Sequence, residues 1–170
     1  MKSLDLSRFR TSNLKYIDLL FSNCNSLTYL DLSNWYFNLI SFTKDIFNSL
    51  YSLKHIKLSY VQTHKTDMSY LFSGLKYIIS LDLSNFEISS VTNMNSMFYN
   101  CKSLTSLYLN FYNFDTYQVS DMGSRFYNCT KLNIIRMDSR INYITFRSDN
   151  LKNTSKMFYN CENLNSLSFN

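Results

Sequence analysis

Four cysteines and two histidines are the residues of this 170-residue chain that could bind a metal or react as nucleophiles. His55 and His64 are nine positions apart, whereas a zinc-binding H-E-x-x-H helix needs histidines four apart. Each cysteine lies three residues after a phenylalanine, and Leu50 and Leu75 take the same place after two other phenylalanines. The four cysteines are Cys24, Cys101, Cys129 and Cys161. A position that accepts either Cys or Leu is typical of an apolar interior, so we expect buried, reduced thiols, with a disulfide between neighbouring repeats as the alternative.

No other set of residues forms a recognisable catalytic or cofactor site. The two glycines, Gly74 and Gly123, cannot supply the glycine-rich loops that hold nucleotide phosphates. Asp5, Asp31 and Asp82 each stand in the middle of a Leu-Asp-Leu triplet, but on different expected strands, where solvated surface carboxylates explain them. The sequence therefore predicts a protein that is not an enzyme and that uses no cofactor or metal.

The charge pattern indicates a mildly basic, solvated surface. The chain has 17 Lys and Arg against 12 Asp and Glu, a formal charge of +5 and a pI near 9.0. The basic residues are spread along the chain, with one denser stretch between Lys131 and Lys156, so we expect no nucleic-acid partner. The segment shows neither a signal peptide nor an apolar run long enough to span a membrane.

The elements that position these residues repeat along the whole chain. Apolar-x-apolar triplets recur at intervals of 26, 26, 25, 26, 28 and 32 residues, starting at Leu4, Leu30, Ile56, Leu81, Leu107, Ile135 and Leu167. Six of them are preceded, nine residues earlier, by a phenylalanine: Phe21, Phe47, Phe72, Phe98, Phe126 and Phe158. A period of this length is the signature of a solenoid, so we expect the phenylalanines to share one interior column.

The spacing within a unit predicts two kinds of structure. In each triplet the outer residues point to one face, which predicts a half-buried strand. Between strands, the apolar residues from Val91 to Cys101 recur at gaps of three and one, which predicts a short helix. Residues 1–170 are thus expected to form one α/β solenoid of about six units of roughly 26 residues, with a parallel strand ladder on the concave side and helical segments on the convex side. Asn, Ser and Asp are expected to form the turns, with Gly74 in a position that Asn holds elsewhere.

The segments Leu-Asp-Leu-Ser-Asn-Phe (81–86), Val-Thr-Asn-Met-Asn-Ser-Met-Phe-Tyr-Asn-Cys (91–101) and Ser-Leu-Thr-Ser-Leu (103–107) resemble the BspA-like leucine-rich repeats of bacterial and protist surface proteins. The resemblance implies a non-catalytic leucine-rich repeat module that recognises a protein or a glycan, or mediates adhesion, at a cell surface or after secretion. The alternative is a scaffold repeat within a larger intracellular assembly, since this segment shows no signal peptide. We also expect a piece of a longer array, whose ends contact further repeats or another chain.

A strand ladder offers its outward residues as a binding surface. The outward positions hold aromatic and charged residues of the types that dominate binding energies, and our candidate contacts are Tyr29, His55, Lys57, Asp82, Tyr108 and Arg136. The alternative is that this row is ordinary solvated sheet surface.

Overall fold

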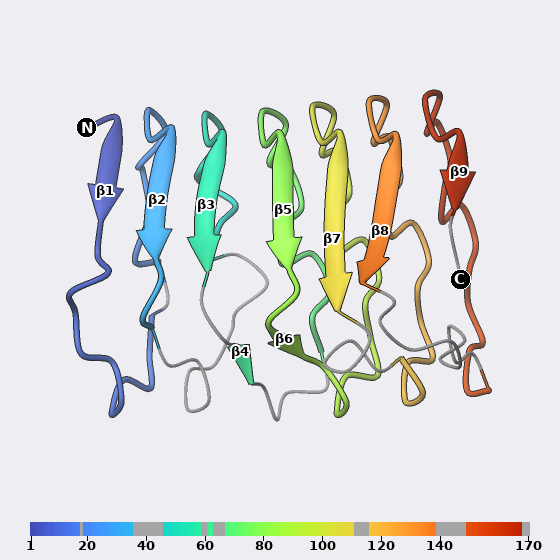
Figure 1. Ribbon diagram of the computed structural model, residues 1–170, viewed down its shortest axis with the longest axis horizontal. Coiled ribbons are helices and arrows are strands. Elements are labelled where there is room, and N and C mark those ends of the chain that lie inside the picture. The colour runs from blue at the N-terminus through green and yellow to red at the C-terminus, as the bar shows by residue number, and fades with distance from the viewer. Residues whose placement is uncertain are drawn as a thin grey trace.

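The chain forms a parallel β-solenoid (Figure 1). The computed structural model describes residues 1–17, 19–35, 46–58, 61–62, 67–110, 116–138 and 149–167, and it leaves the side chains at 61–62, 110, 136–138 and 166–167 undescribed. Within these ranges, one face carries a row of seven short strands: β1 (Ser3–Asp5), β2 (Tyr29–Leu32), β3 (His55–Leu58), β5 (Ser80–Leu83), β7 (Ser106–Asn110), β8 (Ile134–Asp138) and β9 (Ser166–Leu167). The predicted solenoid is thereby confirmed.

The strands pair in parallel with the register that the repeat predicts. Leu30 lies opposite Leu4 and Ile56 in the sheet β1-β2-β3, and Leu107 lies opposite Leu81 and Ile135 in the sheet β5-β7-β8-β9. The two sheets meet between β3 and β5, where the amide of Ile79 still donates to the carbonyl of Lys54 at 3.3 Å. A second, two-stranded parallel pair, β4 (Val61–Gln62) with β6 (Phe86–Glu87), lies beyond the ends of these strands.

The predicted phenylalanine column forms the centre of the core. Successive rings stack almost parallel with centroids 5.3 to 5.7 Å apart from Phe47 to Phe158, and Phe21 follows at 6.3 Å from Phe47. Phe47, Phe72 and Phe98 are fully buried. Stacked aromatic rings bury large apolar areas, so this column joins every unit to the next.

The helical segments predicted between strands are wrong: the described residues contain no helix. From Met94 to Asn100, every second amide donates sideways to the next unit, as in the 2.9 Å bond from Phe98 to the carbonyl of Arg125. The amides between them close tight turns, as Tyr99 does onto Ser96 at 3.0 Å. A helix would require the same amides to bond within their own segment, so lateral bonding between units excludes it.

In five of the six units, the turn after the core phenylalanine uses a residue in the left-handed backbone region at the same place. Asn100, Asn128 and Asn160 have φ values of 62°, 63° and 61°, and Gly74 takes the equivalent position with φ 78°. This position needs a residue that tolerates positive φ, which Asn and Gly do better than most others. The side-chain Nδ2 of Asn128 also donates to Oδ1 of Asn100 at 2.7 Å, so the asparagines link neighbouring units.

Candidate binding surface

The outward face of the strands brings the predicted contact residues into two adjacent rows. Tyr29 lies opposite His55, and Lys57 follows two residues later opposite Asp31. Tyr108 lies between Asp82 and Arg136 in the β5-β7-β8 sheet. The structure thus divides the six candidates between an N-terminal group on β2 and β3 and a C-terminal group on β5, β7 and β8.

In the N-terminal group, Tyr29 and Lys57 both contact Asp31. The hydroxyl of Tyr29 donates to the Asp31 carboxylate at 3.0 Å, and Lys57 Nζ lies 3.4 Å from the same oxygen, Oδ2. The ammonium group also lies 5.8 Å from the centre of the Tyr29 ring. Asp31 is only 6% exposed, so the expectation that it is a solvated surface carboxylate is wrong.

These contacts shift the pKa values of both charged groups. Partial burial alone would raise the pKa of Asp31, but the hydrogen bonds from Ser33, Tyr29 and Lys57 outweigh it, so the pKa lies below its ordinary value. The pKa of Lys57 is raised, first by its interaction with Tyr29 and then by Asp31. Tyr29 and Lys57 therefore already contact each other and Asp31, and a partner would have to compete with these contacts.

The aspartates of the Leu-Asp-Leu-Ser sequence have a structural task that the sequence analysis missed. Asp5, Asp31 and Asp82 each accept a 2.9 Å hydrogen bond from the backbone amide two residues later. This Asx turn ends the strand by giving the backbone a side-chain acceptor. Asp82 is exposed, but one of its carboxylate oxygens is engaged in its own turn.

The C-terminal group contains two exposed side chains. Tyr108 is 39% exposed and Asp82 is exposed beside it. Arg136 occupies the matching position of β8, while its side chain lies outside the described residues. In the N-terminal group, His55 is exposed as well, and it lies on β3 at the boundary between the two sheets. An exposed tyrosine on a rigid strand can bind a partner at little cost in conformational entropy.

The cysteines are interior thiols, as predicted. All four are free; Cys101 and Cys129 are buried, and Cys24 and Cys161 are partly buried. The thiol of Cys101 donates to the carbonyl of Phe72 at 3.1 Å, and that of Cys129 donates to the carbonyl of Phe98 at 3.1 Å. Burial raises the pKa of Cys101 to about 12, which keeps it protonated at neutral pH and unreactive. Among the described residues, no group of three His, Cys, Asp or Glu side chains could hold a metal ion.

A buried arginine in the core escaped the sequence analysis. Arg125 is 1% exposed, and its guanidinium carbon lies 5.2 Å from the centre of the Phe126 ring and 5.8 Å from that of Phe98. Burial lowers its pKa to about 9. Aligning the units would have placed it where Leu71 and Met97 stand, which was the available signal.

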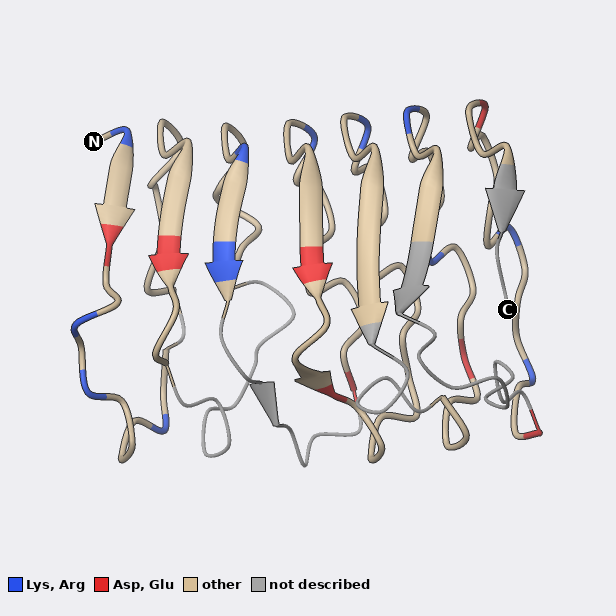
Figure 2. Ribbon diagram, in the orientation of Figure 1, with Lys and Arg blue, Asp and Glu red and all other residues tan. Residues whose placement is uncertain are grey.

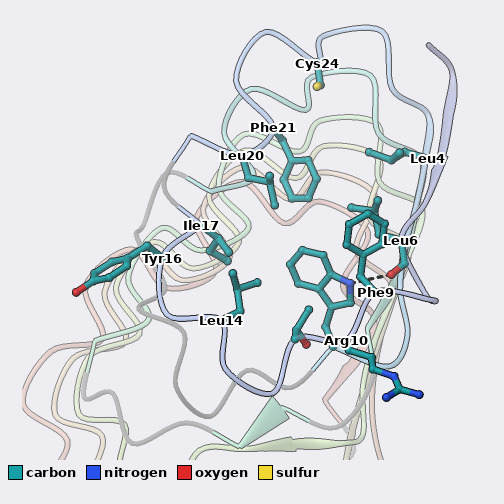
Figure 3. Close-up of a pocket in the computed structure, with 12 residues that line it drawn as sticks. Leu4, Leu6, Phe9, Arg10, Leu14, Tyr16, Ile17, Leu20, Phe21 and Cys24 are labelled. Atoms are coloured by element: carbon teal, nitrogen blue, oxygen red, sulfur yellow. Dashed lines mark hydrogen bonds between the residues drawn. The ribbon is translucent and has the colours of Figure 1, made fainter.

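The N-terminal end of the solenoid contains an apolar cavity of about 410 Å³ (Figure 3). Leu4 and Leu6 border it on one side, and Leu14, Ile17 and Phe21 border it on the other. The indole of Trp35 closes one wall, because its Nε1 donates to the carbonyl of Leu6 at 2.9 Å. The cavity lies at the end of the phenylalanine column.

Fold and surface together define a repeat protein of the parallel β-solenoid class, with a structured face of polar and aromatic side chains. The chain belongs to the family described as "Mycoplasma protein of unknown function, DUF285", whose model matches residues 2–80 and again residues 66–169. A search of curated proteins gave no match. In the part of the chain that the structure describes, no helix has the length and apolar character needed to cross a membrane.

Proposed function

We propose that this solenoid is a non-catalytic binding module that recognises a protein or a glycan through the C-terminal half of its strand face. The observation that carries the proposal is the position of Tyr108, 39% exposed between Asp82 and Arg136 on three paired strands. Tyrosine and arginine are the residue types that most often dominate binding energies. In the N-terminal group, Tyr29 and Lys57 contact Asp31.

The repeat supports a relation to leucine-rich repeat proteins of the BspA-like type, with about six units and the strand face as the recognition side. The pattern Leu-x-x-Leu-x-Leu places the strands, and their in-register pairing is the arrangement that such a surface requires. On this proposal the module acts in adhesion at a cell surface or after secretion. The turns that replace the convex helices are the point where this chain departs from a strand-and-helix repeat.

The test is a binding screen of the purified chain on arrays of glycans and of extracellular protein domains. For each hit, the affinity of Tyr108→Ala is compared with that of Tyr117→Ala, a matched control with 38% exposure that lies outside the strands. We expect a loss of about tenfold or more for Tyr108→Ala and less than about twofold for the control. Equal affinities for the wild type and Tyr108→Ala, or no binding on either array, would contradict the proposal.

A scaffold role is the second candidate, and the cavity at the N-terminal end favours it. Leu20, which lines this cavity, is 46% exposed, and at the other end Met157 and Phe158 are only partly buried. An apolar end face of one copy could therefore cover that of another. We expect sedimentation velocity to show concentration-dependent association that Leu20→Lys weakens. A monomer over the whole accessible concentration range would contradict the scaffold role and leave the binding module unaffected.

A further inference from the structure

One edge of the solenoid carries a row of exposed lysines. Lys2, Lys54, Lys76, Lys102 and Lys131 lie one to four residues before β1, β3, β5, β7 and β8. They belong to the edge where the strands begin, which is the upper edge of Figure 2. We call these five residues the lysine edge. They are spread through the sequence because each belongs to a different unit, so the expectation of scattered positive charge holds along the chain but not in space.

Backbone hydrogen bonds join the units along this edge. The amide of Lys54 donates to Thr28, that of Ile79 donates to Lys54, and that of Thr105 donates to Ile79, at 2.9, 3.3 and 2.9 Å. Further along, the amide of Ser103 donates to the carbonyl of Lys76 at 3.1 Å. Lys76 and Lys102 hold equivalent positions in adjacent units and therefore lie about one strand spacing, roughly 5 Å, apart. Lys54 aligns with Ile79 rather than with Lys76, and the unit of β2 adds no lysine, so the other lysines of the edge are more widely spaced.

The charges of this edge are not neutralised within the described protein. All five lysines are exposed, and none of them forms an ion pair with another described residue. Glu162 is the one acidic residue on the described turns of this edge, in the turn before β9. Asp5, Asp31 and Asp82 lie toward the opposite ends of the strands. A row of like charges is costly to hold together, and an external anionic surface would relieve that repulsion.

Apolar and aromatic side chains accompany the lysines on the same turns. Tyr51 is 51% exposed, Tyr77 47% and Ile79 42%. The ammonium group of Lys76 lies 5.0 Å from the centre of the Tyr77 ring. Tyrosine rings beside lysines are typical of surfaces that sit at the boundary between water and lipid headgroups.

We propose that the lysine edge docks on an anionic lipid bilayer. The turns project beyond the strands as a ridge, which suits contact with a plane of headgroups (Figure 1). Lysines would face phosphate and carboxylate groups, while Tyr51, Tyr77 and Ile79 would enter the headgroup layer. A single-stranded nucleic acid could bind the lysines and stack on the tyrosines, but it would not contact an exposed isoleucine favourably. The bilayer is therefore the partner that accounts for all the residues of the edge.

The test measures cosedimentation of the purified chain with vesicles of phosphatidylcholine containing about 30% phosphatidylserine, and with pure phosphatidylcholine vesicles. We expect binding only to the anionic vesicles, falling as salt is raised. Each lysine near an anionic surface contributes about a fivefold factor, so Lys76→Gln/Lys102→Gln should bind about 25-fold more weakly. Lys152→Gln/Lys156→Gln changes the net charge equally but lies outside the edge, and it should change binding less than about twofold.

A further variant, Tyr77→Ser, separates insertion from charge and should weaken vesicle binding at high salt as well as at low salt. Three results would overturn the proposal: equal binding to neutral vesicles, equal losses for the two double variants, or displacement from vesicles by a single-stranded oligonucleotide at equal charge. The last result would assign the edge to nucleic acid. None of these results depends on Tyr108, so the vesicle assay can refute the lysine-edge proposal without refuting the proposed function, and the array screen can do the reverse.

Discussion

Replacing Phe98 by alanine tests the shared core most severely. The ring is fully buried, and it stacks on Phe72 with centroids 5.7 Å apart and on Phe126 with centroids 5.3 Å apart. Removing a buried phenylalanine costs about 3–5 kcal/mol through lost transfer energy and the cavity left behind. This range already contains the loss of the two aromatic pairs, each of which contributes about 0.5–1.5 kcal/mol. We therefore expect a loss of about 4 kcal/mol in the free energy of unfolding.

The assay is equilibrium unfolding in urea, followed by the circular dichroism of the sheet. With a slope of about 2 kcal/mol/M, a 4 kcal/mol loss moves the midpoint by about 2 M. Phe158→Ala is the first control, because this partly buried ring at the end of the column stacks on one described neighbour only, at 5.4 Å, and should lose about half as much. Phe9→Ala, 61% exposed, should lose less than about 0.5 kcal/mol. A loss below about 1 kcal/mol for Phe98→Ala, or equal losses for all three variants, would refute a continuous stacked core.

Four further changes probe individual features of the fold. Hydrogen bonds lower the pKa of Asp31 in the folded protein. The stability that Asp31 contributes is therefore present above its unfolded pKa of about 4 and is lost as the pH falls through its folded pKa. The urea midpoints of wild type and Asp31→Asn should accordingly differ at pH 7 and converge in acid. Arg125→Met should raise the free energy of unfolding by about 1–4 kcal/mol, because it removes a buried charge where Met97 stands one unit earlier; a destabilised variant would show that the guanidinium supports the core. Asn100→Gly and Asn100→Ala both lose the hydrogen bond from Asn128, and Asn100→Ala should lose about 1 kcal/mol more at this positive φ; equal midpoints for the two variants would argue against the left-handed turn. The thiol of Cys101 should react with a maleimide only in denaturant, and rapid modification of the native protein would contradict its burial.

The strands and the core column could be predicted because both depend on residues that repeat in the sequence. The two-residue spacing of Leu81 and Leu83 sets one face of a strand, and in-register stacking then places every phenylalanine at one depth. The same reasoning placed the cysteines inside, because a position shared by Cys101 and Leu75 has one environment. The repeat period, together with the residue types that replace one another at equivalent positions, was thus enough to predict which residues form the core.

The turns that replace the helices could not be predicted from apolar spacing. Gaps of three and four residues fit one face of a helix, but they also fit successive tight turns that bury every third or fourth side chain. The signals that favour turns were Ser96 and Asn100, which adopt φ values of 55° and 62°. Lateral hydrogen bonds decide between the two structures, and they depend on a neighbouring unit rather than on the segment itself.

The candidate surfaces were predicted only in part, because their properties depend on contacts between units. The repeat sets the strand position of each candidate residue, yet the burial of Asp31 requires Tyr29 from its own strand and Lys57 from the next. The lysine edge likewise forms only when Lys76 and Lys102 are stacked side by side. Charges one unit apart in sequence look dispersed, although the fold makes them neighbours.

Both proposed surfaces depend on units joined side by side through lateral hydrogen bonds, and one measurement tests that joining directly. Nuclear magnetic resonance detects scalar couplings across individual hydrogen bonds. The structure predicts a coupling between the amide of Phe98 and the carbonyl carbon of Arg125, whose oxygen lies 2.9 Å from the Phe98 nitrogen. A coupling from the Phe98 amide to the carbonyl of Met94, four residues earlier as in a helix, would contradict the lateral ladder and the surfaces built on it.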